Sequence, residues 1–219
     1  MKSVTIGNSV TSIGNYAFRG CSGLTSIIVE SGNSVYDSRE NCNAIIETAT
    51  NTLISGCKNT IIPNSVTKIG NHAFDECSGL TSVTILNSVT SIGICAFYEC
   101  YGLTRIDAYP NPAKVSLGSG VFYNVPKDGT LHVLPKYLSA YQTASQWSDF
   151  TNIVADLSDG VTGDTNNDNE VNVTDVVGIA NYVMGETPGI FNQANADING
   201  NGSVDVSDVV KLANIILGV

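Results

Sequence analysis

Two acidic loops of twelve residues near the C-terminus carry the side chains best suited to chemistry. In each loop, oxygen-bearing side chains stand at positions 1, 3, 5, 9 and 12. A hard cation such as Ca²⁺ takes about six to eight oxygen ligands, and this spacing lets a short loop surround one ion, with the backbone carbonyl of position 7 as a further ligand. The expected ligands are Asp164, Asn166, Asp168, Glu170, Asn172 and Asp175, and Asp197, Asn199, Asn201, Ser203, Asp205 and Asp208. The chain is therefore predicted to bind two calcium ions.

The charge of the chain is concentrated in the same region. Residues 157–219 hold nine acidic residues and one basic residue, Lys211, whereas residues 1–156 hold eleven acids and nine bases. The alternative to metal loops is a solvated acidic tail. The regular spacing of the carboxylates, with apolar residues between them, favours the metal loops. Because the chain has no basic patch, nucleic acid is not an expected partner.

Each acidic loop runs into a segment with the apolar spacing of a helix. Position 6 of such a loop needs a positive φ, which Gly202 supplies in the second loop and Asn169 must supply in the first. Gly185 and Gly218 are placed to end the two helices. The apolar residues of the first helix are Val173, Val176, Val177, Ile179, Ala180, Tyr182 and Val183, and those of the second are Val206, Val209, Val210, Leu212, Ala213, Ile215, Ile216 and Leu217.

Internal repeats fill the N-terminal part. Residues 8–26 recur as residues 64–82 with fifteen of nineteen positions identical, and a third copy begins 23 residues after the second. The first two copies are 56 residues apart, which predicts an expanded unit over residues 26–59. Since a single repeat cannot bury its apolar faces, the copies are expected to stack on one another.

Each repeat places apolar residues at four points. A Leu-x-x-Ile-x-Val type segment is expected to form a strand with one buried face, and Val-x-x-Ile begins a second inward-facing segment. A glycine follows where we expect a sharp turn, and an Ala-Phe pair then puts an aromatic ring into the core. The strand residues are Leu24, Ile27 and Val29, Leu80, Val83 and Ile85, and Leu103, Ile106 and Ala108. The other positions are Val10, Ile13, Gly14, Ala17 and Phe18, Val66, Ile69, Gly70, Ala73 and Phe74, and Val89, Ile92, Gly93, Ala96 and Phe97.

The blocks Asn-Ser-Val-Thr-x-Ile-Gly, Ala-Phe-x-x-Cys and Ser-Gly-Leu-Thr-Ser resemble the BspA-type leucine-rich repeats of bacterial surface proteins, over about residues 4–156. The resemblance implies a β-rich leucine-rich-repeat solenoid. Residues 42–57 fit a hairpin that turns at residues 49–51. Residues 131–155 look like a terminal cap, with a strand, a short helix after Pro135 and a closing strand near residues 152–155. Trp147 and Phe150 would cover the open end of the core.

All six cysteines lie in the repeat part. The two histidines, His72 and His132, are isolated, which disfavours both a zinc site and a catalytic Cys/His pair. Buried free thiols that act as small hydrophobic groups are the favoured role. Cys77 and Cys100 hold the same repeat position and should stack about one strand spacing apart. Cys42 and Cys57, which flank the predicted hairpin, are the best candidates for a disulfide.

Asp at loop position 12, the missing entering helix and two similar halves separated by Pro188-Gly189 resemble a dockerin type I module over about residues 163–219. The resemblance implies a small α-helical calcium-binding module that binds a cohesin domain through loop positions 10 and 11 and the helix that follows. The valines at position 10 differ from the hydroxyl pair that many dockerins carry at positions 10 and 11. The alternative is a calcium-bound module that only caps the solenoid. The expected partner-binding residues are Val173, Thr174, Val206, Ser207 and Lys211.

We therefore expect a β-rich leucine-rich-repeat solenoid (1–156), a linker (157–162) and a dockerin type I-like module (163–219). The favoured function is a secreted or cell-surface protein without catalysis, which docks onto a cohesin and presents the solenoid as a recognition surface. The alternative is an adhesin that binds a host or microbial surface ligand directly. An enzyme is disfavoured because no catalytic motif occurs. No run of 18 apolar residues predicts a membrane span.

Overall fold

The structure is a computed structural model that describes residues 1–14, 16–157, 162–166, 170–186 and 191–219. It divides into two compact units, Met1–Leu157 and Ser158–Val219, and each is described by itself. The expectations for Asp168, Asn169 and Pro188-Gly189 lie outside the described residues. None of the described helices has the length and hydropathy that a bilayer span requires.

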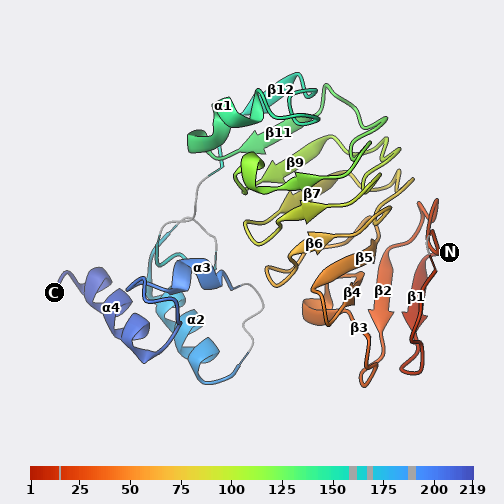
Figure 1. Ribbon diagram of the computed structural model, residues 1–219. Coiled ribbons are helices and arrows are strands. Elements are labelled where there is room, and N and C mark those ends of the chain that lie inside the picture. The colour runs from red at the N-terminus through yellow and green to blue at the C-terminus, as the bar shows by residue number, and fades with distance from the viewer. Residues whose placement is uncertain (15, 158–161, 167–169, 187–190) are drawn as a thin grey trace. The chain divides into compact units, whose positions relative to one another are not determined.

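The first unit is a solenoid in which equivalent strands of successive repeats lie side by side (Figure 1). Four of these strands form a parallel sheet in the order β12-β11-β9-β7. Val83, Ile106, Leu131 and Ile153 pair in register across it, so the same repeat position stacks from coil to coil. The inner-face residues of β7 and β9 are buried, as the sequence predicts. The strands are β7 (Ser82–Ile85), β9 (Arg105–Ala108), β11 (Thr130–Val133) and β12 (Asn152–Val154).

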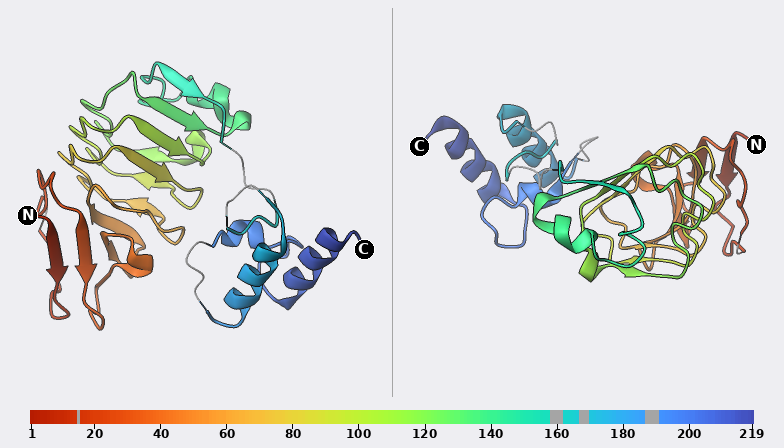
Figure 2. Two further views of the ribbon diagram at one scale, coloured as in Figure 1. Left: turned by 180° about the vertical axis from the view of Figure 1, so that it is seen from behind. Right: turned by 90° about the horizontal axis from the view of Figure 1, so that it is seen from above.

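A second sheet of six strands has the order β10-β8-β6-β5-β4-β3. Its repeat strands are parallel, whereas β3, β4 and β5 pair antiparallel. The β4–β5 pair confirms the predicted hairpin, with its turn between Glu47 and Thr52. The view from above in Figure 2 looks along the stack, and the yellow and green coils superpose around a shared interior. The strands are β3 (Tyr36–Asp37), β4 (Ala44–Glu47), β5 (Thr52–Gly56), β6 (Lys68–Ile69), β8 (Ser91–Ile92) and β10 (Ser116–Leu117).

The first coil is less regular than the others. Its strands β1 (Ser3–Ile6) and β2 (Ser26–Val29) form a separate two-stranded parallel sheet. The segment from Val10 to Ile13 forms no strand, and both of these side chains are only half-buried. Because the hairpin of the expanded unit pairs with β6, no strand of the first coil joins the six-stranded sheet.

The phenylalanines of the repeats form a ladder along the core. The rings of Phe74 and Phe97 lie nearly parallel with their centres 5.1 Å apart, and those of Phe97 and Phe122 are 5.7 Å apart. The rings of Trp147 and Phe150 pack against the ring of Phe122, with ring centres 4.8 and 5.4 Å apart, which confirms the predicted cover of the core's end.

Two short helices, η3 (Pro135–Tyr137) and α1 (Leu138–Tyr141), confirm the predicted helix of the cap. The short helices η1 (Arg39–Asn41) and η2 (Pro112–Lys114) lie in connecting segments.

The role of the repeat glycines differs from the expected one. Gly70 and Gly93 do not have a positive φ. Instead, an added Cβ would lie 2.9 Å from the Leu53 carbonyl oxygen at Gly70 and 2.5 Å from the Asn71 nitrogen at Gly93. Glycine is therefore required because neighbouring coils approach closely. The sharp corners use a positive φ two residues later, at His72 and Cys95.

The proposed disulfide is wrong, because all six cysteines are free thiols. Cys42 belongs to the main core cluster and Cys57 to the cluster of the first coil. Their sulfurs lie against different carbonyl groups, of Ala44 at 3.8 Å and Asn43 at 3.4 Å. Burial raises the pKa of Cys42 and Cys77 to about 11, so both keep their protons at neutral pH.

The described residues of the second unit form two main helices, α2 (Val173–Val183) and α4 (Val206–Leu217), and the short α3 (Gln193–Ala196), which was not predicted from the sequence. Ile179, Ala196, Ile198 and Leu212 form its small core. Gly185 and Gly218 follow the two main helices with a φ of 84° and 72°, as predicted. The three helices bring the two acidic loops into one compact unit.

Candidate metal loops and partner-binding face

The second acidic loop folds its side-chain oxygens back onto its own backbone. The two carboxylate oxygens of Asp197 accept hydrogen bonds from the N–H groups of Gly200, Asn201 and Gly202, at 2.7 to 3.1 Å. The amide oxygen of Asn199 accepts from the Asn201 N–H at 3.0 Å. Gly202 has a φ of 87°, which confirms the need for glycine at position 6. The oxygens at the first loop positions are thus held in place by the turn itself.

Loop positions 9 and 12 also cap the helix that follows. Asp205 is the N-cap of α4, and its carboxylate accepts from the N–H and hydroxyl of Ser207 at 2.7 and 2.6 Å. The Asp208 carboxylate accepts from the Asp205 N–H at 3.0 Å and from the Asn199 N–H at 3.1 Å. This reciprocal capping box satisfies N–H groups at the helix start that have no partner within the helix. The same carboxylate therefore connects the beginning of the loop to the helix.

The first loop repeats this arrangement. Asn172 is the N-cap of α2 and accepts from the Thr174 N–H at 2.8 Å. The Asp175 carboxylate accepts from the Asn172 N–H at 3.0 Å and from the N–H groups of Thr165 and Asn166 at 2.7 and 3.2 Å. The matching bonds in both halves mean that the duplicated sequence builds the same local structure twice.

The burial of three carboxylates suits a bound cation. Asp175 and Asp208 are fully buried and Asp164 is almost so. A buried ion costs several kcal/mol, of the order of 3–5, unless an opposite charge compensates it. Lys211, the one base between residues 157 and 219, is exposed. A divalent cation with oxygen ligands would supply the missing positive charge, so the donor set fits calcium better than a softer metal.

Two further observations concern the ligands. The Ser207 hydroxyl and N–H lower the pKa of Asp205 below its ordinary value, which favours the ionised form. Within the described residues, no three His, Cys, Asp or Glu side chains gather into a metal site. The acidic loops rely as well on amide, hydroxyl and backbone oxygens, and Asp168 lies outside the described residues.

The expected partner-binding residues are all exposed. Val173 is 66% exposed and Val206 62%, and Thr174, Ser207 and Lys211 are exposed as well. The hydroxyls also belong to the loops, because Thr174 accepts from the Asn166 amide at 3.2 Å and Ser207 from the Asn199 amide at 2.8 Å. Two of the expected partner-binding residues, Thr174 and Ser207, therefore each share a hydrogen bond with a predicted ligand of the same loop.

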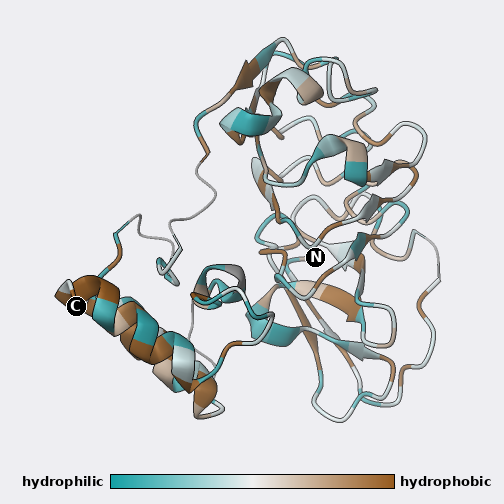
Figure 3. Cartoon of the chain, turned by 60° about the vertical axis from the view of Figure 1, so that its left-hand side comes forward, coloured by the Kyte–Doolittle hydropathy of each residue, from teal (hydrophilic) through white to brown (hydrophobic). Residues whose placement is uncertain are grey.

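The apolar residues of each main helix occupy two faces rather than one stripe. Ile179 and Leu212 are buried, with Val176, Val183 and Val209 packed around them. The other face is exposed, and Figure 3 shows that α4 carries hydrophobic residues up to its C-terminal end. We call its members the outer stripe, with the same spacing on both helices: Val173, Val177 and Met184 on α2, and Val206, Val210 and Leu217 on α4.

Known proteins resemble the two units separately. A family model described as "BspA type Leucine rich repeat region (6 copies)" matches residues 1–55 and 53–136. The model of the dockerin type I domain matches residues 162–217. No protein with a curated description matches the chain.

Several solved structures are similar to parts of the chain. A leucine-rich repeat protein from Eubacterium ventriosum has 24% identity and a TM-score of 0.51 over 72% of this chain and 43% of its own. A leucine rich cell surface protein from Faecalibacterium prausnitzii has 24% identity and a TM-score of 0.44, over 73% of this chain and 49% of its own. The chain thus spans less than half the length of either protein. The first of these likenesses supports the fold alone.

A third similar structure is a type I cohesin–dockerin complex from Clostridium thermocellum. Its matching chain has 31% identity and a TM-score of 0.26, and the match covers 26% of this chain and 92% of that one.

Dockerin type I domains are calcium-binding modules. Both families are typically non-catalytic interaction modules, and their proteins are typically extracellular or surface-associated. The two family matches agree with the repeat ladder in the first unit and with the duplicated loop-helix arrangement in the second. The chain belongs to the BspA type leucine rich repeat family and carries a C-terminal dockerin type I domain.

Proposed function

We propose that this protein is a secreted or cell-surface interaction protein without catalytic activity, whose dockerin binds a cohesin domain in a calcium-dependent way. One observation carries the proposal: behind each capped loop, the helix exposes an apolar stripe at the same positions. An exposed apolar patch on a small unit commonly marks an interaction site. The proposed limits are 1–156 for the solenoid, 157–162 for the linker and 163–219 for the dockerin.

Calcium is proposed as a structural cofactor with two ions, one in each loop. The proposed ligands are the twelve residues predicted from the sequence. Four of them also form the capping boxes of the helices: Asn172 with Asp175, and Asp205 with Asp208. Each ion would neutralise buried carboxylates and thereby fix the start of the helix that carries the outer stripe. Cohesin binding would then depend on calcium because the ion holds the two stripes in place.

The solenoid is proposed to bind a host or microbial surface ligand. The outward positions of the four-stranded sheet are polar, with Ser82, Arg105, Thr130 and Asn152 in one registered row. Arg105 pairs with Asp107 at 2.9 Å on the same face. A polar face on a rigid repeat scaffold suits the recognition of another surface.

The test is binding of the whole chain to a type I cohesin domain, such as the cohesin of the Clostridium thermocellum complex, with millimolar calcium and with EDTA. A Val173→Asp/Val206→Asp double variant places a charge in both stripes and should weaken binding by at least about 100-fold, since central interface residues commonly contribute 2 kcal/mol or more. The matched control is Ile215→Asp, because Ile215 is also exposed but lies about half a turn around α4 from Val206.

A panel of type I cohesins reduces the risk of choosing the wrong partner. Binding that is lost with EDTA and in the double variant, but kept in the control, supports the proposal. Failure of the whole panel in calcium would overturn cohesin docking. The solenoid alone would then be left to bind a surface ligand, as in an adhesin.

A further inference from the structure

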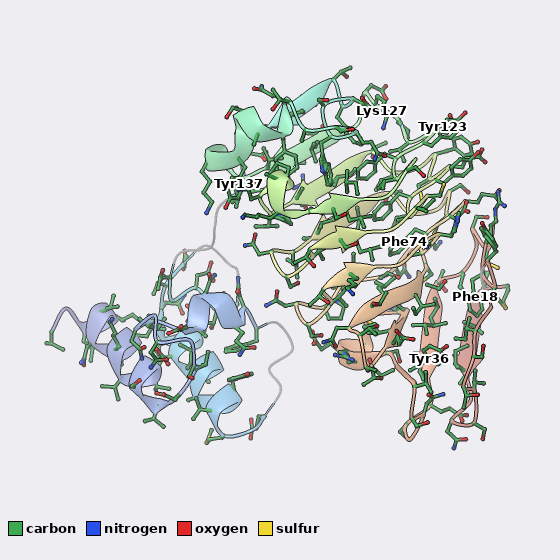
Figure 4. All side chains as sticks on the ribbon, in the orientation of Figure 1. Phe18, Tyr36, Phe74, Tyr123, Lys127 and Tyr137 are labelled. Atoms are coloured by element: carbon green, nitrogen blue, oxygen red, sulfur yellow. The ribbon has the colours of Figure 1, made fainter. Side chains whose placement is uncertain are left out.

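A small cavity lies in the solenoid between the corner of the first coil and the corner of the second repeat copy. Aromatic rings of Tyr16, Phe18 and Phe74 line it together with the polar side chains of His72 and Asp75. Figure 4 labels Phe18 and Phe74, one from each of these two corners. The proposed docking function does not use this cavity.

The cavity exists because these two corners do not pair as the others do. Between later coils, backbone bonds join the corners directly, for example Phe74 N–H to the Ala96 oxygen at 2.8 Å and Phe97 N–H to the Val121 oxygen at 3.0 Å. Between the first and second corners, the described residues make one long bond, from Gly20 N–H to the Asp75 oxygen at 3.4 Å. Side chains therefore bridge a gap that the backbone leaves open.

Asp75 has an unused acceptor at this gap. Its side chain is only 2% exposed, and one carboxylate oxygen, Oδ2, lies 2.8 Å from Nδ1 of His72. The other oxygen, Oδ1, is buried and has no hydrogen-bond partner among the described residues. A buried acceptor without a partner costs about 1–3 kcal/mol, and more when it is charged. Because Asp75 lines the cavity, a ligand bound there is placed to supply the missing hydrogen-bond donor.

Two carboxylates and one arginine lie at this corner. Nδ1 of His72 lies 2.8 Å from Oδ2 of Asp75, and Nε2 of the same ring lies 3.0 Å from the Tyr16 hydroxyl. Arg19 pairs with Glu76 at 2.8 Å and lies 3.6 Å from Asp75. One cation thus faces two carboxylates. The guanidinium of Arg19 also lies over the Tyr16 ring, 5.6 Å from its centre, so the rim of the cavity already holds one cation by an aromatic face.

We propose that this cavity binds a small organic cation with N–H donors, either a primary ammonium or a guanidinium group, which donates to Oδ1 of Asp75 between the aromatic rings. Charge complementarity selects a cation, the free acceptor selects an N–H donor, and the aromatic walls favour a cation over a neutral amide. The same group could belong to a free amine or to a lysine or arginine side chain of a bound peptide.

The test is calorimetric titration of the whole chain with ethylguanidinium, propylammonium and, as a neutral match, N-ethylurea. Both cations should bind at least about 10-fold more tightly than the urea, given the strength of a charge-assisted hydrogen bond. Asp75→Asn should remove this preference, whereas Asp107→Asn, in a half-buried carboxylate of β9, should keep it. A Gly-Gly-Arg-Gly-Gly peptide separates the two sources: tighter binding than ethylguanidinium indicates a protein partner, and weaker binding indicates a free amine.

If Asp75→Asn fails to fold, the unaltered chain still decides the question. A high-resolution crystal structure at saturating ethylguanidinium should place its nitrogen within hydrogen-bond distance of Oδ1 of Asp75. Water alone at that oxygen, equal binding of the cation and the urea, or undiminished binding by a folded Asp75→Asn variant would each overturn the proposal.

Discussion

The solenoid and the dockerin differ in which side chains they bury and which they expose. The solenoid buries most of its large apolar residues in two core clusters, and its 156 residues are nearly neutral. The dockerin buries carboxylates and exposes Val173, Met184, Val206 and Leu217. Stacked repeats bury one another's apolar faces and pair one another's strands, because each coil presents a matching strand and ring to its neighbour. The small core, the buried carboxylates and the exposed apolar stripe of the dockerin are the features on which we base the proposed calcium ions and the proposed partner.

The largest effect is expected from the ladder of the solenoid. Phe97→Ala removes the ring between Phe74 and Phe122 and should lower the free energy of unfolding of the solenoid by about 3–5 kcal/mol, because a fully buried aromatic leaves a large cavity. Urea unfolding followed by hydrogen exchange in each unit measures this. The loss should be the same with calcium and with EDTA, and a calcium-dependent loss would contradict the separation of the two units.

The next effect concerns the loops. Asp208→Asn keeps the shape of the side chain but removes a buried charge. Calcium titration should give an affinity of the second loop about 100-fold lower, which corresponds to about 3 kcal/mol of lost stabilisation at saturating calcium. The control is Glu186→Gln, an exposed acid outside both loops. An unchanged affinity would mean that Asp208 serves only as a helix cap.

A smaller effect should follow from the close approach of the coils. Gly93→Ala places a Cβ against the neighbouring backbone and should cost about 1–3 kcal/mol, the usual range for overpacking. Gly14 holds the same repeat position, but an added Cβ there meets nothing within 4 Å. Gly14→Ala should therefore be neutral or slightly stabilising in the same urea measurement. If both substitutions lower the free energy of unfolding equally, glycine is needed at this repeat position for a sharp turn, as we expected from the sequence.

The last effect is a pH dependence of the stability of the solenoid. Because burial raises the pKa of Cys42 and Cys77 from 9.0 to about 11, the folded state keeps these protons longer than the unfolded chain. The resulting stabilisation is complete below pH 9 and is lost as the pH rises through 11. The urea midpoint of the solenoid should fall over this range, and less so in a Cys42→Ala/Cys77→Ala variant. The dockerin has no cysteine and serves as the internal control.

Much of both units follows from local patterns in the sequence. The 23-residue period predicts which strand faces pack inward, because stacked copies must bury the same positions. The hairpin, the cap, and the ends of both main helices at Gly185 and Gly218 were likewise predicted. These features depend on neighbours in the chain or on the repeat, so a single sequence contains them.

Features that depend on non-equivalent neighbours were missed. The sequence grouped the exposed Val177 with the buried Ile179, because an apolar spacing alone does not tell which side of a helix meets a core. Gly70 was assigned to a turn although the Leu53 carbonyl restricts it. Cys42 and Cys57 flank one hairpin but face different clusters. The hairpin was predicted, but the repeat pattern did not show that the corners of the first coil and of the second repeat copy would fail to pair as the others do and leave a gap at Asp75.

The central claim is that calcium holds the dockerin together while the solenoid needs no ion. Hydrogen exchange of the whole chain, measured in millimolar calcium and again in EDTA, tests it most directly. We expect the amides of α2 and α4 to lose their protection in EDTA and those of β7, β9 and β11 to keep theirs unchanged. Protection of α2 and α4 that is the same in both conditions would contradict the account.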